Sequence, residues 1–282
     1  MPTVAVTGAT GFIGRHIVRV LEGMGSCRII AVGRDEGRLQ SLGVQYVVAD
    51  LNIDRKEYYD LLGRPDVLIH LAWEGLPNYR ELFHIERNLM ASYRFLKAMI
   101  EQGLPSLTVS GTCYEYGLQS GRLTEETPAA PTTSYGIAKD CLRRFLYALR
   151  EHHSFHFIWA RLFFLHGEGQ HSGSLIPQID RAMESGAHSF DMSGGEQLRD
   201  YLPVADAASL LAKISLQSRF DGVFNICSGK PISVRRLAEQ RVAQHESTMK
   251  LNFGVFPYPE HEPLAYWGDD SRLRRAVEAS GG

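Results

Sequence analysis

Hydrophobic and polar residues follow two patterns along the first half of the chain. Short hydrophobic runs lie at 4–6, 28–32, 44–48, 67–70, 107–110 and 155–164, and each suits one buried strand. Segments with helical spacing lie between them, the longest at about 12–24, 79–101 and 134–151. Strands that alternate with helices of this length form βαβ units. The pattern therefore predicts an α/β fold with a doubly wound parallel sheet.

The second half has a different pattern. Glycine and serine are frequent from 167 to 195, and a helix at 204–216 is followed by a strand at 222–227. The end of the chain combines a helix from 234 with a proline-rich stretch at 256–263. We expect a smaller C-terminal lobe interleaved with the sheet. The predicted division assigns residues 1–165 to the sheet domain, with return elements near 200–228, and residues 166–199 and 229–282 to the lobe.

Composition and charge exclude several classes of protein. The chain is 44% hydrophobic and 22% charged, as a globular protein is, and 30 Lys and Arg against 32 Asp and Glu give no broad attraction to nucleic acid or membranes. The four cysteines have neither the density of a disulfide scaffold nor zinc spacing, and the histidines at 152, 153 and 156 should diverge, so no metal is expected. Neither a signal peptide nor an 18-residue hydrophobic span is seen, and a cytoplasmic location is expected.

A glycine-rich turn joins the first predicted strand to the first helix. Residues 7–14 read Thr-Gly-Ala-Thr-Gly-Phe-Ile-Gly, with glycines three residues apart. Such glycines permit a tight turn and a close approach of the backbone to a pyrophosphate, while the helix N-terminus offers unpaired N–H groups to the phosphates. The turn predicts a Rossmann dinucleotide-binding domain at 1–165, with contacts from Gly8, Thr10, Gly11, Phe12, Ile13 and Gly14.

The end of the second strand bears on which dinucleotide is bound. It reads Gly33-Arg34-Asp35, where a protein that prefers NAD usually places an acidic residue for the ribose diol. A guanidinium at Arg34 suits the 2′-phosphate of NADP instead. We expect NADP, with NAD as the alternative.

The spacing Tyr-x-x-x-Lys occurs twice, at Tyr93 and Lys97 and at Tyr135 and Lys139. On a helix, either pair shares one face. A nearby ammonium lowers the pKa of a tyrosine, which can then exchange a proton with a substrate alcohol or carbonyl while a nicotinamide exchanges hydride. Tyr93 lies within a hydrophobic helical stretch and is expected to pack, whereas Tyr135 follows the fifth strand and is the better catalytic candidate.

The segment before Lys139 carries a family resemblance. It contains, in order, Glu125, Pro128, Pro131, Tyr135, Gly136, Ala138 and Lys139. With the glycine turn, this pattern resembles the extended short-chain dehydrogenase/reductases, the NAD-dependent epimerase/dehydratase family. The resemblance implies that Tyr135 and Lys139 are catalytic and contact the cofactor. It implies Thr112, four residues before Tyr116, as the third catalytic residue, with Ser110 as the alternative.

Other positions match the same family. The resemblance implies cofactor contacts from Asp50, Leu51, Leu71, Ala72 and Asn88. It implies substrate contacts from Trp73, Thr112, Cys113, Tyr114 and Arg199. The last of these opens the segment Arg-Asp-Tyr-Leu-Pro-Val-Ala-Asp, whose arginine reaches the substrate diphosphate in members that act on nucleotide sugars. A nucleotide-sugar substrate is thus expected, and the helices at 79–101 and 134–151 are expected to form a homodimer interface.

The residues after Thr112 restrict the reaction. Dehydratases of the family carry carboxylates where this chain has Cys113 and Tyr114, and Glu115, one residue later, should face the opposite way. An epimerase-reductase of the fucose-synthase kind has its cysteine at the place of Tyr114. The resemblance favours a ketoreductase that acts at C4 of a nucleotide-linked 4-keto-6-deoxy sugar. A 4-epimerase with tightly held NAD is the alternative, a non-catalytic NAD(P) sensor is another, and the nucleotide and sugar stay open.

Overall fold

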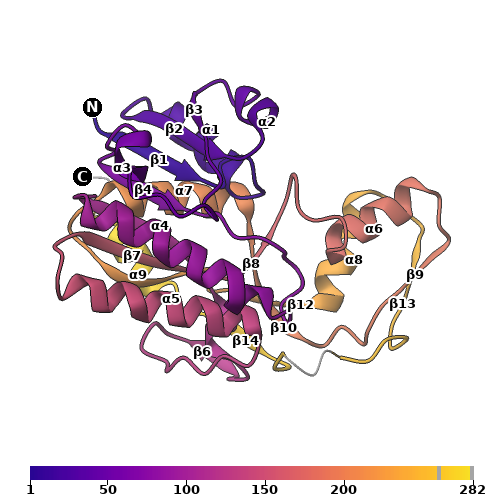
Figure 1. The fold of residues 1–282 in the computed structure, drawn as a ribbon. Helices are drawn as coiled ribbons and strands as arrows, with labels where there is room; N and C mark the ends of the chain where they lie inside the picture. The colour runs from indigo at the N-terminus through magenta and orange to yellow at the C-terminus, as the bar shows by residue number, and fades with distance from the viewer. Residues whose placement is uncertain (259–261, 280–282) are drawn as a thin grey trace.

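A seven-stranded parallel sheet forms the centre of the molecule. The computed structural model describes residues 1–258 and 262–279 (Figure 1). The strand order is β11-β7-β5-β4-β1-β2-β3, which is the predicted doubly wound α/β arrangement. The strands are β1 (Thr3–Thr7), β2 (Arg28–Gly33), β3 (Gln45–Val48), β4 (Val67–His70), β5 (Ser106–Thr112), β7 (His156–Leu162) and β11 (Gly222–Ile226).

Helices cover both faces of this sheet, which explains why its strands are hydrophobic throughout. Val4 and Val6 of β1 pack into one hydrophobic cluster, while Ala5 points the other way into a second. One face carries α1 (Gly14–Met24), α7 (Val204–Leu216) and α9 (Ser271–Glu278). The other carries α3 (Tyr58–Leu61), α4 (Met90–Glu101) and α5 (Ser134–Arg150), and α2 (Glu36–Gln40) joins β2 to β3.

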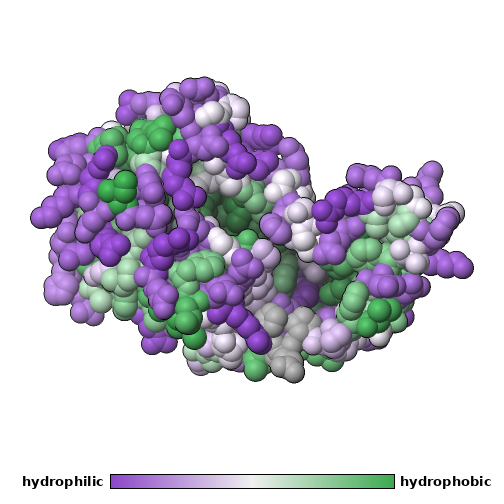
Figure 2. Space-filling view, turned by 45° about the vertical axis from the view of Figure 1, so that its right-hand side comes forward, coloured by the Kyte–Doolittle hydropathy of each residue, from purple (hydrophilic) through white to green (hydrophobic). Residues whose placement is uncertain are grey.

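A smaller lobe stands beside the sheet domain (Figure 1). Its outer part contains α6 (Leu175–Glu184), α8 (Val234–Gln244), β9 (Ser189–Asp191) and β13 (Lys250–Asn252), which share a separate hydrophobic cluster. A small sheet of β8 (Phe164–His166), β10 (Leu198–Pro203) and β12 (Pro231–Ser233) connects the two parts, and β6 (Gly121–Leu123) pairs with β14 (Tyr266–Gly268). The surface is hollowed between sheet domain and lobe, with hydrophobic residues in its depth (Figure 2).

The structure corrects several details of the predicted elements. The helix expected at 79–101 begins only at His84 and opens with a π-helical turn, η1 (His84–Leu89), before α4. The run at 155–164 is divided between β7 and β8, and α6 lies in the glycine-rich stretch where no helix was expected. The proline-rich stretch at 256–263 falls partly outside the described residues.

The predicted boundary of the lobe also differs at its C-terminal end. The segment 229–282 was assigned to the lobe as a whole, yet α9 packs against α7 and β11 of the sheet domain. Leu273 and Ala276 of α9 are buried in the main hydrophobic core. Over the described parts of the chain, no helix combines the length and hydrophobicity needed to cross a membrane.

Candidate functional site

The glycine turn after β1 forms a cradle that excludes side chains. Gly8 has a φ of +67°, and a Cβ there would lie 2.9 Å from the backbone nitrogen of Ala72. A Cβ on Gly14 would overlap the carbonyl oxygen of Gly8, which already accepts a hydrogen bond from the nitrogen of Gly11 at 2.9 Å. Only glycine fits these positions, and the turn leaves the backbone bare at the start of α1. This is the geometry that a pyrophosphate requires.

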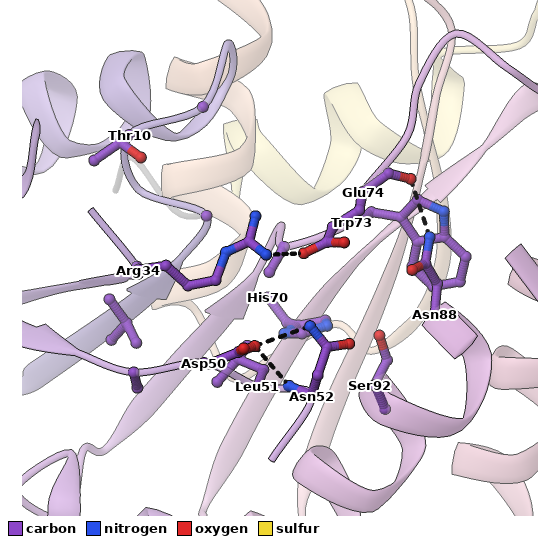
Figure 3. Close-up of a pocket in the computed structure, with 17 residues that line it drawn as sticks. Thr10, Arg34, Asp50, Leu51, Asn52, His70, Trp73, Glu74, Asn88 and Ser92 are labelled. Atoms are coloured by element: carbon purple, nitrogen blue, oxygen red, sulfur yellow. Dashed lines mark hydrogen bonds and ion pairs between the residues drawn. The ribbon is translucent and has the colours of Figure 1, made fainter. Parts of the chain in front are cut away.

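A pocket extends from this cradle along the carboxyl ends of β1, β2, β3 and β4 (Figure 3). Among the predicted cofactor and substrate contacts, it is lined by Gly8, Thr10, Gly11, Arg34, Asp50, Leu51, Ala72, Trp73 and Asn88. The predicted contacts outside this lining are Phe12, Ile13, Gly14 and Leu71, Thr112 at the end of β5, Cys113 and Tyr114 after it, Tyr135 and Lys139 of α5, and Arg199 of β10. Ligands bind at this edge in doubly wound folds, because loops on both sides of the sheet diverge there.

Two carboxylates hold the polar side chains of the pocket in place (Figure 3). Asp50 accepts hydrogen bonds from the backbone and the side chain of Asn52, at 3.0 and 2.9 Å, and the backbone bond is the main cause of its lowered pKa. Glu74 forms ion pairs with Arg34 and with Arg87. No local pattern marks Glu74 as a site residue, since it follows β4 in a loop and meets Arg34 only through the fold.

His70 lies at the carboxyl end of β4 with its ring in the wall of the pocket. Its Nδ1 lies 2.9 Å from the hydroxyl of Thr7, and burial lowers its pKa to about 3, so the ring is neutral. Its buried Nε2 has no hydrogen-bond partner among the residues that the structure describes. A cradle that a Cβ would fill and a buried polar atom without a partner both fit a bound dinucleotide.

The three predicted catalytic residues lie together at the carboxyl end of β5. Thr112 ends the strand, Tyr135 stands in the first turn of α5, and Lys139 follows one turn later. All three are buried. Burial holds the pKa of Tyr135 well above its usual value, and a hydrogen bond with Thr112 opposes this shift. The helix is fixed at this end by Thr133, which caps it by accepting from the nitrogen of Gly136.

Lys139 is held from two sides. Its Nζ donates to the carbonyl oxygen of Ser110 at 2.8 Å and lies 4.0 Å from the centre of the Trp73 ring. Burial lowers its pKa to about 7, and the charge of Glu115 acts in the opposite direction. The ammonium is therefore close to its titration point near neutral pH. Ser110, the alternative to Thr112, contributes its backbone carbonyl, and its hydroxyl donates to the carbonyl oxygen of His70.

The second Tyr-x-x-x-Lys pair lies elsewhere. The ring of Tyr93 packs edge-on against Phe145 of α5, with centroids 5.2 Å apart. Lys97 is half exposed and pairs with Glu101 of its own helix. This pair is part of the contact between α4 and α5, away from the pocket.

Three predicted substrate residues, Cys113, Tyr114 and Arg199, lie outside the lining of this pocket. Cys113 is buried in a hydrophobic cluster, and burial raises the pKa of its thiol to about 12. Tyr114 stacks on Tyr79 and donates from its hydroxyl to Glu262 at 2.6 Å. Arg199 is buried and pairs with the same Glu262 at 2.8 Å. The sequence did not predict the contacts of Glu262 with Tyr114 and Arg199, because its surrounding segment is notable only for its prolines.

Comparisons with known proteins give consistent findings. A family model described as "NAD dependent epimerase/dehydratase family" matches residues 4–227. The chain is 32% identical to dTDP-6-deoxy-L-talose 4-dehydrogenase (NAD(+)) of Aggregatibacter actinomycetemcomitans, over 94% of this chain and 98% of that one. It is 22% identical to GDP-6-deoxy-D-talose 4-dehydrogenase of the same organism, over 88% and 83% of the two chains.

Solved structures share the fold. The structure of UDP-N-acetylglucosamine 4-epimerase from Methanobrevibacter ruminantium M1, in complex with UDP-N-acetylmuramic acid, superposes with a TM-score of 0.86 at 24% identity, over 98% of this chain and 91% of that chain. MoeE5 in complex with UDP-glucuronic acid and NAD superposes with a TM-score of 0.83 at 26% identity, over 98% and 92%. The likeness extends over both the sheet domain and the lobe.

Proposed function

The chain belongs to the NAD-dependent epimerase/dehydratase family, and we propose that it oxidises and reduces C4 of a nucleotide-linked 6-deoxy sugar. Two relatives support this reaction, because both are named as 4-dehydrogenases of 6-deoxytalose nucleotides. The observation that carries the proposal is the buried group of Thr112, Tyr135 and Lys139 beside the glycine cradle. The two residues after Thr112 are a buried thiol and a phenol, without the carboxylates that a dehydratase uses.

The three residues divide the work of moving one proton. When bound, a nicotinamide dinucleotide exchanges hydride with the carbon of the alcohol or ketone. Tyr135 gives its proton to the ketone oxygen during reduction and takes it back during oxidation. Lys139 as an ammonium stabilises the phenolate form, whose formation burial opposes. The hydroxyl of Thr112 orients the reacting oxygen toward Tyr135.

The lobe side of the site is proposed to hold the nucleotide. Arg199 is the candidate for binding the diphosphate, since a guanidinium can donate two parallel hydrogen bonds to phosphate oxygens. Glu262 occupies that guanidinium in the structure, so a diphosphate has to take the place of the carboxylate. Tyr114, next to the catalytic group and bonded to Glu262, is proposed to contact the sugar.

For the cofactor we propose NAD rather than the NADP favoured by Arg34 alone. The guanidinium of Arg34 already pairs with Glu74, so a 2′-phosphate would compete with a carboxylate and face its negative charge. A ribose with free hydroxyls meets no such repulsion. The 6-deoxytalose relative named for NAD(+) supports the same choice.

We further propose that two copies pair through α4 and α5. Met90 of α4, and Ile137 and Phe145 of α5, are between 37% and 39% exposed, and a second copy packed on these two helices would cover them. Light scattering of the purified protein is expected to give twice the monomer mass. Replacing Phe145 by glutamate should return the mass to that of one chain.

The function is tested by offering dTDP-6-deoxy-L-talose or GDP-6-deoxy-D-talose to the purified protein with NAD or NADP, and following reduced cofactor by its absorbance. Net formation of reduced cofactor with either sugar supports a 4-dehydrogenase. Conversion of the sugar to its C4 epimer, with NAD retained on the protein and no net reduction, would replace the proposal by an epimerase. Absence of both reactions, with cofactor bound, would favour a sensor.

A further inference from the structure

A buried carboxylate, that of Glu115, lies behind the catalytic residues. Its side chain has no exposed surface and accepts hydrogen bonds from two elements of the sheet domain. From β5 the backbone nitrogen of Thr112 donates at 2.9 Å. From β7 the indole nitrogen of Trp159 donates at 2.9 Å and Nε of Arg161 at 2.8 Å. Arg143 of α5 lies 3.8 Å away.

The carboxylate also lies close to the groups that hold Lys139. A Cβ on Gly111 would stand 2.6 Å from Oε1 of Glu115 and would overlap the indole of Trp159. The next residue toward the N-terminus is Ser110, whose carbonyl accepts from Nζ of Lys139. Glycine at 111 thus lets the carboxylate reach β5 between the residue that holds Lys139 and the catalytic Thr112.

We propose that Glu115 is a positioning residue for the reaction: its carboxylate fixes the backbone of Thr112 and supplies the negative charge that keeps Lys139 an ammonium. This inference rests on the proposed function. It assigns two tasks to one side chain, and they need different properties. Fixing Thr112 requires the reach of a glutamate, and supporting Lys139 requires its charge.

Stability alone gives a weaker reason for this arrangement. Burying a carboxylate and a guanidinium removes both from water, and well-packed hydrophobic residues in their place are often as stable. Here the pair leaves Nη1 of Arg161 without a hydrogen bond among the described residues, so the network is incomplete as a structural device. At Thr112, by contrast, the carboxylate and the threonine hydroxyl cap the turn η2 (Cys113–Tyr116) reciprocally.

The charges around Lys139 come from several elements. Glu115 acts on it from the turn after β5, while the rings of His70 on β4 and His84 on η1 feel its charge and are themselves kept neutral by burial. Glu115 in turn faces Arg161 on β7, Arg143 on α5 and the phenol of Tyr135. The charge of Glu115 raises the pKa of Lys139, so replacing Glu115 by an uncharged residue should lower that pKa.

Two variants separate the two tasks. Glu115→Gln keeps the reach to Thr112 and removes the charge, whereas Glu115→Asp keeps the charge and shortens the reach. Asp140→Asn is the matched control, since Asp140 pairs with the same Arg143 but has no contact with Thr112. The chain has six lysines, so carbon-13 labelling of the lysine Cε atoms gives few signals, and loss of one signal in Lys139→Arg identifies Lys139. The titration is read by NMR, without any sugar, beside kcat as a function of pH.

For Glu115→Gln we expect the titration of Lys139 to move down by roughly one pH unit, with the alkaline limb of kcat moving alike. For Glu115→Asp we expect an unmoved titration and a kcat lowered roughly 10- to 100-fold at every pH. An unmoved titration in Glu115→Gln, or a shift as large in Asp140→Asn, would overturn the charge role. Wild-type kcat in Glu115→Asp would overturn the positioning role. If the glutamine variant does not fold, the aspartate variant still tests the second task.

A failure of the proposed function would look different. In that case the wild-type protein itself would turn over no 6-deoxy sugar nucleotide, while the NMR titration would still report whether Glu115 supports the charge of Lys139. The two outcomes are therefore separable.

Discussion

Two arginines with glutamate partners lie near the proposed catalytic residues, and their partners differ in how far they are enclosed. Arg161 belongs to β7 and meets Glu115, whose side chain is fully enclosed and receives two further donors, from Thr112 and Trp159. Arg199 belongs to β10 and meets Glu262, whose side chain is 15% exposed at the border of the lobe. The same kind of ion pair is fully enclosed in the core in one place and partly exposed in the other, where we propose that a substrate diphosphate replaces the carboxylate.

The surroundings explain this difference. Around Glu115, backbone and indole N–H groups leave no room for another anion, so the carboxylate cannot be exchanged. Around Arg199, the guanidinium lies over the ring of Tyr266 at 4.7 Å and donates from Nη1 to the carbonyl oxygens of Leu198 and Leu264, while Nε and Nη2 meet Glu262. Enclosed pairs should therefore affect stability and geometry when altered, and border pairs should affect binding. By the same reasoning, changing the enclosed His70 should affect stability, and changing the pair of Arg34 and Glu74 in the pocket should affect cofactor binding.

The largest effect on activity is expected from removing the hydroxyl of Tyr135. Tyr135→Phe deletes the hydroxyl that we propose exchanges the proton, so kcat should fall about 1,000-fold or more while cofactor affinity stays within about threefold. Steady-state kinetics and cofactor titration measure the two quantities. Tyr93→Phe, at the other Tyr-x-x-x-Lys pair, is the control and should keep full activity. Substantial turnover by Tyr135→Phe would remove Tyr135 from the proposed mechanism.

Matched substitutions of the two arginines test the comparison itself. Arg161→Met leaves Glu115 enclosed without its cation, and we expect the free energy of unfolding to fall by about 3–5 kcal/mol. Arg199→Met should change stability less but lower kcat/KM by about 100-fold, mainly through KM, because the diphosphate loses its partner. Denaturant unfolding and kinetics are run on both variants. Equal effects of the two on stability would contradict the distinction between enclosed and border pairs.

The enclosed region should also respond to acid through His70. The pKa of this ring is about 3 in the folded protein against an ordinary 6.5, so below pH 6.5 the unfolded chain takes up a proton that the folded chain does not. The free energy of unfolding therefore falls as the pH drops from 6.5 toward 3, by up to about 1.4 kcal/mol per unit. Between pH 7 and pH 5, His70→Asn should lose about 2 kcal/mol less than the wild type. If urea unfolding shows the same loss of free energy in His70→Asn and in the wild type, His70 is not the cause of the acid sensitivity.

The smallest expected effect belongs to the pocket pair. Glu74→Gln removes the carboxylate that occupies Arg34, and the preference for NAD over NADP in kcat/KM should fall about tenfold, equal to about 1.4 kcal/mol. The control is Glu86→Gln, since Glu86 is an exposed carboxylate on η1 that does not line the pocket. A preference unchanged by Glu74→Gln would show that the pair of Arg34 and Glu74 does not select between NAD and NADP.

The sequence could predict features that depend on neighbouring residues, and it could not predict contacts between residues far apart in the chain. Alternating strands and helices predicted the sheet domain well, because β1, β4 and α7 are defined by local hydrophobic pattern and by the turns beside them. The proposed catalytic residues Thr112, Tyr135 and Lys139 were selected by the order of strands and helices and by the family resemblance, because the Tyr-x-x-x-Lys spacing alone occurs twice. The structure brings the three together at the carboxyl end of β5.

The ion pairs could not be predicted, since their partners are far apart in the chain. Arg161 and Glu115 are 46 residues apart, and Arg199 and Glu262 are 63 apart. Nothing local to Glu262 or to Glu74 marks either as a partner of an arginine. The helix α6 was missed for a related reason, because its hydrophobic face matches only the small core of the lobe.

The return of α9 to the sheet domain has a consequence for how the protein is made. Leu273 and Ala276 complete a core whose first members, Val4 and Val6, leave the ribosome long before them. The strand β11 and the helix α9 are likewise synthesised after the first helix of the lobe. The nascent chain therefore holds an uncovered face of α7 until α9 has been made, which makes residues 271–278 as important for solubility during synthesis as the glycine turn is for the cofactor cradle.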